Sequence, residues 1–256
     1  MDDADLLERE RRSQAAYYRA IAAGHPDSFV AVPGDGVQAT VVPVSPERSL
    51  PNSVVYEAPG AVLECHDEIA ALYAAAGVRA WTVWVRPGDD DLAAELERRG
   101  HRLDGTPAIM GAQLDAMDLE PRMSLDLDPV IGWDVAGAIN DRAYGLEPGS
   151  LSTPLAGLTR EAMPLLVARV DGEHVACAAF HVVEGDCAAE FVATLPQARG
   201  RGVAAELMRE GLRRARSAGA VTATLEGSTM GQPIYERLGY RVLGRMRMLE
   251  LRADAA

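Results

Sequence analysis

The order of apolar and polar residues predicts two successive series of helices and strands. In the first half the pattern predicts helices and strands at 3–23, 28–32, 37–44, 53–57, 66–76, 80–85, 90–99 and 108–114. In the second half it predicts elements at 133–144, 165–169, 173–183, 187–195, 202–218, 221–226, 232–238 and 241–251. Glycines follow several of the helices, where a left-handed cap is favoured. The fold class is therefore α/β (α+β), with mixed, mostly antiparallel sheets flanked by helices.

An internal repeat relates the two halves. Glu97–Arg102 matches Glu236–Arg241 at an offset of 139 residues. Upstream, Gly88 matches Gly227 at an offset of 139, and Gly77 matches Gly219 at an offset of 142. A duplicated fold explains these matches with one three-residue gap, whereas chance matching of glycines at helix ends is the alternative. The acidic segment 115–128 has no sustained apolar period, so the predicted domains are 1–116 and 117–256.

Charge and composition exclude several functions. The 256 residues include 25 Lys plus Arg against 38 Asp plus Glu, a net charge of −13, so nucleic acid is not an expected partner. All 25 are arginine, which excludes mechanisms that need a lysine amine. An acidic start and the lack of an 18-residue apolar run predict a cytoplasmic protein without a membrane span. Three widely spaced cysteines suggest neither disulfides nor a metal site.

The segment Leu195–Ala204 lies between a predicted strand and an amphipathic helix. Such a turn directs backbone N–H groups and the helix dipole toward one point, where a phosphate can bind. Gly200 and Gly202 permit close approach of an anion, and Arg199 and Arg201 supply positive charge. Taken alone, the segment is equally well explained as a solvated loop.

The spacing of Arg199, Gly202 and Ala204 resembles the Arg/Gln-x-x-Gly-x-Gly/Ala motif of the GCN5-related N-acetyltransferase (GNAT) family. Leu225–Tyr240 is similar to a later motif of that family, a strand and polar turn before a helix that ends in Leu-Gly-aromatic. The resemblance is good over 128–251 and faint over 1–116. It implies two tandem GNAT-like domains and an enzyme that moves an acetyl group from acetyl-CoA to a primary amine of a small molecule or peptide.

By resemblance, Tyr235 is the general acid that protonates the CoA thiolate, and its alternative role is that of a core tyrosine. Glu190 is the expected base, with a solvated strand-end carboxylate as the alternative reading and His181 as the alternative base. Strict strand alternation places Glu190 on one face with Val192 and Thr194. The cofactor contacts implied are Val192, Ala193, Arg199, Gly200, Arg201, Gly202, Val203 and Ala204.

The first half departs from the family pattern. At the repeat offsets Glu57 replaces Arg199, Pro59 removes one amide, and Leu96 replaces Tyr235. A degenerate copy that does not bind acetyl-CoA is therefore expected. A non-catalytic acyl-CoA-binding regulatory module is the alternative to an enzyme, a tandem thiol-conjugate synthase is a variant of the enzyme, and both a monomer and a homodimer remain open.

Overall fold

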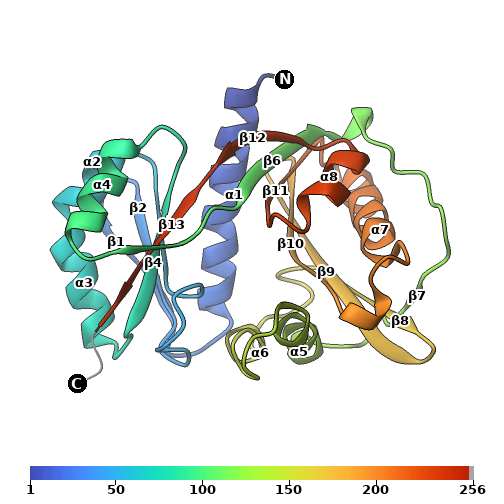
Figure 1. Ribbon diagram of the computed structural model, residues 1–256, viewed down its shortest axis with the longest axis horizontal. Coiled ribbons are helices and arrows are strands. Elements are labelled where there is room, and N and C mark those ends of the chain that lie inside the picture. The colour runs from blue at the N-terminus through green and yellow to red at the C-terminus, as the bar shows by residue number, and fades with distance from the viewer. Residues whose placement is uncertain (254–256) are drawn as a thin grey trace. The chain divides into compact units, whose positions relative to one another are not determined.

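The structure is a computed structural model that describes residues 1–253. The chain forms two compact units. Unit 1 combines Met1–Tyr17 with Ala108–Leu243, and unit 2 combines Tyr18–Pro107 with the chain from Gly244 onward (Figure 1). Each unit is a mixed sheet flanked by helices, so the predicted fold class is confirmed.

Unit 1 is built on a seven-stranded sheet in the order β12-β6-β11-β10-β9-β8-β7. Phe180 and Cys177 point to opposite faces of β9, because strand side chains alternate. Helix α7 packs on the Phe180 face, where a side chain at Gly211 would collide with the Phe180 ring. Helix α5 packs on the other face, where Asn140 lies 3.2 Å from the Cys177 sulfur. The elements, of which α1 and β12 continue past the bounds of the unit, are α1 (Asp3–Ala23), β6 (Ala108–Gln113), β7 (Asp126–Leu127), α5 (Trp133–Tyr144), α6 (Ser152–Leu155), β8 (Leu165–Val170), β9 (Glu173–Val183), β10 (Asp186–Thr194), α7 (Val203–Ser217), β11 (Thr222–Gly227), α8 (Gln232–Leu238) and β12 (Arg241–Arg245).

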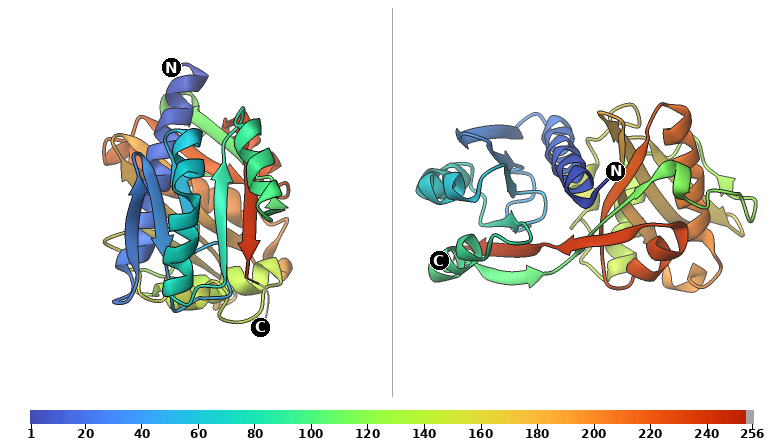
Figure 2. Two further views of the ribbon diagram at one scale, coloured as in Figure 1. Left: turned by 90° about the vertical axis from the view of Figure 1, so that its left-hand side faces the viewer. Right: turned by 90° about the horizontal axis from the view of Figure 1, so that it is seen from above.

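Unit 2 is built on a six-stranded sheet in the order β1-β2-β3-β4-β13-β5. Its core includes Trp81 and Tyr73, whose rings stack at 5.0 Å. In the left-hand view of Figure 2 the red strand β13 lies beside the teal strand β4. The elements are β1 (Phe29–Gly34), β2 (Val37–Val41), β3 (Ser53–Tyr56), α2 (Pro59–Glu64), α3 (His66–Ala75), β4 (Ala80–Val85), α4 (Asp90–Arg98), β5 (Arg102–Gly105) and β13 (Arg247–Arg252).

The contiguous division into 1–116 and 117–256 differs from these units. Strand β6, the last of the first half, pairs antiparallel with β11 in unit 1, and β13 pairs antiparallel with β4 in unit 2. The single strand expected at 241–251 is broken at Met246, and its two parts belong to different sheets. Local apolar alternation is the same for either pairing, so it does not reveal which sheet a strand joins.

The repeat offsets seen in the sequence also relate these strand pairs. Adding 142 to the bounds of β4 gives β11, and adding 139 to the bounds of β6 gives β13. The registers agree as well, because Val85 pairs with Arg247 where Gly227 pairs with Ala108. Strands β4 and β11 thus occupy equivalent positions in the two sheets. Each of them pairs with the last strand of the other half of the chain.

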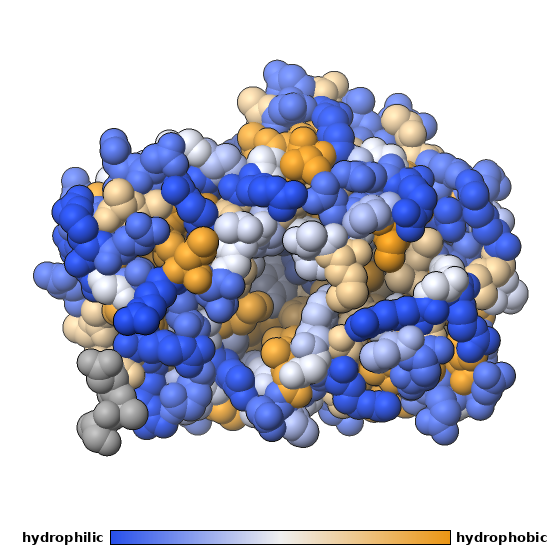
Figure 3. Space-filling model, in the orientation of Figure 1, coloured by the Kyte–Doolittle hydropathy of each residue, from blue (hydrophilic) through white to orange (hydrophobic). Residues whose placement is uncertain are grey.

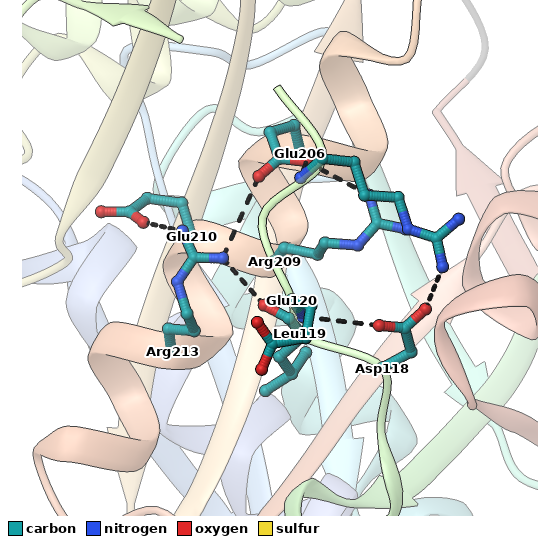
Figure 4. Close-up of polar contacts among 8 residues, drawn as sticks. Asp118, Leu119, Glu120, Glu206, Arg209, Glu210 and Arg213 are labelled. Carbon is teal, nitrogen blue, oxygen red and sulfur yellow. Dashed lines mark hydrogen bonds and ion pairs between the residues drawn. The ribbon is translucent and has the colours of Figure 1, made fainter. Parts of the chain in front are cut away.

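The acidic segment expected at the boundary runs along helix α7. Arg213 donates to the Leu119 carbonyl at 2.8 Å, and the Arg122 amide donates to the buried carboxylate of Glu206 at 3.1 Å. Glu206 also accepts from Arg209 at 3.3 Å (Figure 4). These charge-assisted hydrogen bonds hold the segment against α7. On the face drawn in Figure 3, hydrophilic side chains predominate.

Candidate acyl-CoA site

Parallel strands β10 and β11 separate part-way along their length. They pair only from Asp186 to Ala188, opposite Thr222–Thr224. The rest of β11 continues to pair with β6 on its other side. Beyond Ala188 the two strands are therefore not paired with each other, and a cavity lies between them.

A bulge in β10 shapes the edge of this cavity. Glu190 pairs with Ala179 and Ala193 with Cys177, so β10 has one residue more than β9 across this interval. Phe191 takes the left-handed conformation with φ of 51°, which is strained for a bulky residue. The expectation that Glu190 shares a face with Val192 is wrong, because the bulge turns Val192 toward the α7 side of the sheet.

The segment between β10 and α7 has the conformation of an anion-binding turn. Gly200 and Gly202 have φ of 74° and 81°, values that favour glycine. Gly202 is the residue before the first helical turn of α7, and Val203 and Ala204 follow it. The first amides of a helix have no partner within the helix, and here they lie beside the cavity.

The two arginines of the turn behave differently. Arg199 donates to the carbonyl of Ala143 at 2.6 Å and to that of Thr194 at 3.1 Å. Its guanidinium therefore joins the end of α5 to the end of β10 and also contributes to the cavity wall. Arg201 is exposed, lies 4.0 Å from Asp171 and is outside the cavity lining.

The cavity has a volume of about 380 Å³ and brings together seven of the eight expected cofactor contacts. Glycine and apolar residues predominate in its lining, as is typical of pockets for small molecules and cofactors. The lining residues are Ala143, Tyr144, Val192, Ala193, Thr194, Ala198, Arg199, Gly200, Gly202, Val203, Ala204, Ala205, Ser228, Met230, Gly231, Ile234, Tyr235 and Arg237.

Tyr235 forms part of the opposite wall of the cavity, on helix α8. Gly231 leaves room for its ring, because a β-carbon there would come within 2.9 Å of the ring and 3.2 Å of the hydroxyl. Burial, with smaller effects from Tyr144 and Glu190, raises the pKa of Tyr235. The side chain therefore stays protonated at neutral pH, as a proton donor must.

The sequence reasoning missed Tyr144, at the end of α5. Its hydroxyl donates to the carbonyl of Val192 at 2.9 Å, so it fixes the residue that follows the bulge. Tyr144 stands before a Gly/Pro/Ser loop, and no local pattern links it with β10. Only its place at the end of a predicted amphipathic helix could have drawn attention to it.

Glu190 lies beside the cavity rather than in its lining, and it is half-buried. Burial, and next the charge of Glu10, raises the pKa of Glu190 to about 8. A carboxyl with that pKa is mostly protonated at pH 7, and its ionised fraction, which grows as the pH rises toward 8, can accept a proton from an ammonium. His181, the alternative base, is buried with its Nε2 3.1 Å from the Ser13 carbonyl, and it does not line the cavity.

Comparison with known proteins gives a family for part of the chain. Residues 138–240 match the model of the acetyltransferase (GNAT) family. This segment includes the bulged strand, the anion-binding turn and Tyr235. No curated protein matches the sequence.

Three solved structures resemble the whole chain. A GCN5-related N-acetyltransferase from Kribbella flavida has a TM-score of 0.69 and 19% identity, covering 96% of each chain. An acetyltransferase of the GNAT family from Novosphingobium aromaticivorans has a TM-score of 0.53 and 20% identity, covering 92% of this chain and 96% of that chain. A tandem GNAT protein from the clavulanic acid biosynthesis pathway has a TM-score of 0.57 and 12% identity, covering 96% of each. At these identities the likeness establishes the fold.

Two features are absent from residues 1–253. Within that range no helix combines the length and apolar character needed to cross a membrane. The same residues contain no group of three or more His, Cys, Asp or Glu side chains that could hold a metal ion.

Proposed function

Because residues 138–240 match the GNAT model and carry the cavity, we propose that this protein transfers an acetyl group from acetyl-CoA to a primary amine. The observation that carries the proposal is the convergence of three features on one cavity. These are the separated strands β10 and β11, the amides at the start of α7, and the buried phenol of Tyr235.

In this proposal the amides of Gly202–Ala204 bind the CoA pyrophosphate, and the pantetheine arm lies between β10 and β11. Glu190 takes a proton from the ammonium of the acceptor. The free amine then attacks the thioester carbonyl, so that a C–N bond forms and the C–S bond breaks. As the tetrahedral intermediate collapses, Tyr235 donates its proton to the departing thiolate, and the second proton lost by the new amide nitrogen restores the Tyr235 hydroxyl.

We further propose that unit 2 is a degenerate copy that binds no acetyl-CoA. Its counterpart of the anion-binding turn is only Glu57 and Ala58, between β3 and α2. The Glu57 amide is already bonded to the Gly36 carbonyl at 2.8 Å. Leu96 is fully buried where unit 1 has Tyr235. The acceptor is a small molecule or peptide amine, and the protein acts in the cytoplasm as a monomer or homodimer.

Two measurements test the proposal. Calorimetric titration with acetyl-CoA should saturate at one equivalent per chain, and CoA release should accelerate when a panel of primary amines is added. Binding without amine-dependent release would favour a non-catalytic acyl-CoA-binding module. A folded protein that does not bind acetyl-CoA would overturn the proposal.

A further inference from the structure

Phe191 holds a backbone conformation that a bulky residue rarely adopts. Among residues 1–253 three non-glycine residues have positive φ, and the other two, Asp171 and Glu184, are polar residues in the hairpin turns on either side of β9. Phe191 lies instead within strand β10, with φ of 51°. Glycine adopts this conformation without strain, whereas a bulky side chain is unfavourable there. The presence of a phenyl ring at this position indicates that the ring itself is used.

Two aromatic side chains from different helices pack against this ring. The ring of Tyr17, on α1, lies 5.7 Å from that of Phe191. The ring of Trp133, at the start of α5, lies 5.5 Å from it in an edge-to-face arrangement. Both partners are buried. Aromatic pairs at these distances are favourable beyond the apolar area that they bury, and two of them match the strain of one residue in order of magnitude.

Hydrogen bonds also attach each of these helices to β10. On α1, Ser13 lies one turn before Tyr17 and donates to the buried carboxylate of Asp186 at 2.8 Å. On α5, the hydroxyl of Tyr144 donates to the carbonyl of Val192 at 2.9 Å. Both aromatic rings are therefore presented by helices that are fixed to the strand that contains the bulge.

The bulge at Phe191 determines the position of the next two residues of β10, which line the cavity. We propose that Tyr17 and Trp133, the aromatic clamp, are positioning residues that hold Phe191 left-handed and so keep those two residues against the thioester of acetyl-CoA. The thioester in this statement rests on the proposed function. Both clamp residues lie outside residues 138–240, which match the GNAT model. The N-terminal helix α1 thus becomes part of the catalytic unit.

Substitutions of Phe191 distinguish a clamp from ordinary packing. Glycine takes a φ of 51° without a clamp, so Phe191→Gly should keep the bulge and lower kcat by no more than about three-fold. Phe191→Leu keeps a bulky side chain but loses both ring pairs. Residue 191 should then relax to an extended conformation, and kcat should fall by roughly ten-fold or more. If the ring only filled space, Leu would be the better substitute, because it leaves a smaller void than Gly.

The α1 side of the clamp is tested by Tyr17→Leu. It should lower kcat by roughly ten-fold with a smaller change in acetyl-CoA affinity, because the anion-binding turn is untouched. Tyr17→Phe retains the ring and should keep kcat within about two-fold of the wild type. In the Phe191→Gly background, Tyr17→Leu should have little further effect on kcat.

Tyr18→Leu is the matched control for Tyr17→Leu. It makes the same change one residue later on α1, where the ring lies 6.4 Å from that of Trp84 in unit 2. It should lower the free energy of unfolding without lowering kcat, because its ring is not paired with Phe191.

Crystal structures of these variants give φ at residue 191 independently of activity. A residue 191 that stays left-handed in Tyr17→Leu and Phe191→Leu would overturn the inference. So would a Phe191→Leu enzyme more active than Phe191→Gly, or an equal loss of kcat in Tyr18→Leu. If φ changes as expected but the wild type acetylates no amine, the proposed function fails while the aromatic clamp stands.

Discussion

The gap between parallel strands is open in unit 1 and filled in unit 2. In unit 1 the edges of β10 and β11 beyond Ala188 line a cavity. In unit 2 the equivalent gap follows Val54, and Tyr56 occupies it. The Tyr56 hydroxyl accepts from the Arg86 amide at 2.9 Å and donates to Asp89 at 2.5 Å. The Tyr56 hydroxyl thus accepts the hydrogen bond of the Arg86 amide, at the end of β4, which would otherwise be available to a ligand.

The turn that follows β10 in unit 1 is longer than the turn that follows β3 in unit 2. Unit 1 has eight residues between β10 and α7, including two glycines in the left-handed conformation. Unit 2 has two residues between β3 and α2, and its helix is broken at Cys65 into α2 and α3. The same strand framework can therefore form a cavity or close it, depending on a short turn and one side chain.

The strongest test of this contrast is to place a carboxylate in each turn. Gly202→Asp should weaken acetyl-CoA binding by at least about 100-fold, about 2.7 kcal/mol, because the charge lies where the pyrophosphate is proposed to bind. Gly60→Asp should leave the affinity unchanged, since Gly60 is exposed and a β-carbon there meets no atom within 4 Å. Calorimetry gives both values.

The φ of 81° at Gly202 strains any side chain, so Gly202→Asn serves as the control for shape without charge. Asn should lose much less affinity than Asp. Wild-type affinity in a folded Gly202→Asp variant would remove the turn from the site. Loss of affinity in Gly60→Asp would mean that unit 2 also binds acetyl-CoA.

The next largest effect is expected from Tyr235→Phe. Tyr235 forms part of the cavity wall in unit 1, and its counterpart at the repeat offset in unit 2 is Leu96. Turnover should fall by roughly ten-fold to a thousand-fold with CoA affinity nearly intact, because a proton donor is lost and little packing changes. Tyr240→Phe is the matched control. Its ring lies 5.9 Å from Tyr235, and its buried hydroxyl has no hydrogen-bond partner among residues 1–253. Steady-state and binding measurements should separate the two variants.

The sequence predicted most elements but not how the halves combine. Helices 133–144 and 232–238 and strand 173–183 have the predicted bounds, because their apolar periods and glycine caps are local signals. Strand β5 and helix α2 were missed, and the break at Met246 was not expected. Which sheet receives β6 or β13 depends on pairing between distant segments, and a local pattern holds no information on it.

Most residues that the sequence assigns to the site lie together in the structure, while their roles stay predictions. Seven of the eight expected cofactor contacts and Tyr235 line one cavity, since they belong to a compact motif. The bulge at Phe191, the bond from Tyr144 to Val192 and the hydrogen bond from Ser13 on α1 to Asp186 were not foreseen. Each depends on contacts between residues more than ten positions apart or on a backbone conformation that Phe rarely adopts.

Glu190→Gln should have a smaller effect than Tyr235→Phe, roughly ten-fold in kcat/KM near pH 7. The loss should shrink as the pH rises, because free amine then forms without a base. His181→Gln is the control, since that side chain faces helix α1 and not the cavity. A Glu190→Gln profile parallel to that of the wild type would show that another group or solvent removes the proton.

The smallest effect is expected from a histidine pair that distinguishes the core of unit 2. His66 and His101 lie 3.1 Å apart through their Nε2 atoms, and His101 Nδ1 donates to the Leu249 carbonyl at 3.0 Å. At the repeat offsets unit 1 has Met208 and Tyr240, which do not titrate near neutral pH. Burial lowers the pKa of His101 to about 4, so the folded state keeps it neutral.

A histidine whose folded pKa is lowered binds its proton more readily when unfolded, so its contribution to stability is full above about pH 6.5 and is lost progressively toward pH 4. At pH 5.5 the loss should be about 1 kcal/mol. The raised pKa of Glu190 gives the opposite slope between about pH 4.5 and 8, so the total stability hides the histidine effect. Glu190 contributes equally to the stability of wild type and His101→Gln, so its contribution cancels in the difference between their unfolding free energies. Denaturant titrations at pH 5.5 and 7.5 measure that difference. The advantage of wild type over His101→Gln should be about 1 kcal/mol smaller at pH 5.5 than at pH 7.5, and an equal difference at both pH values would show that the pair does not titrate with folding.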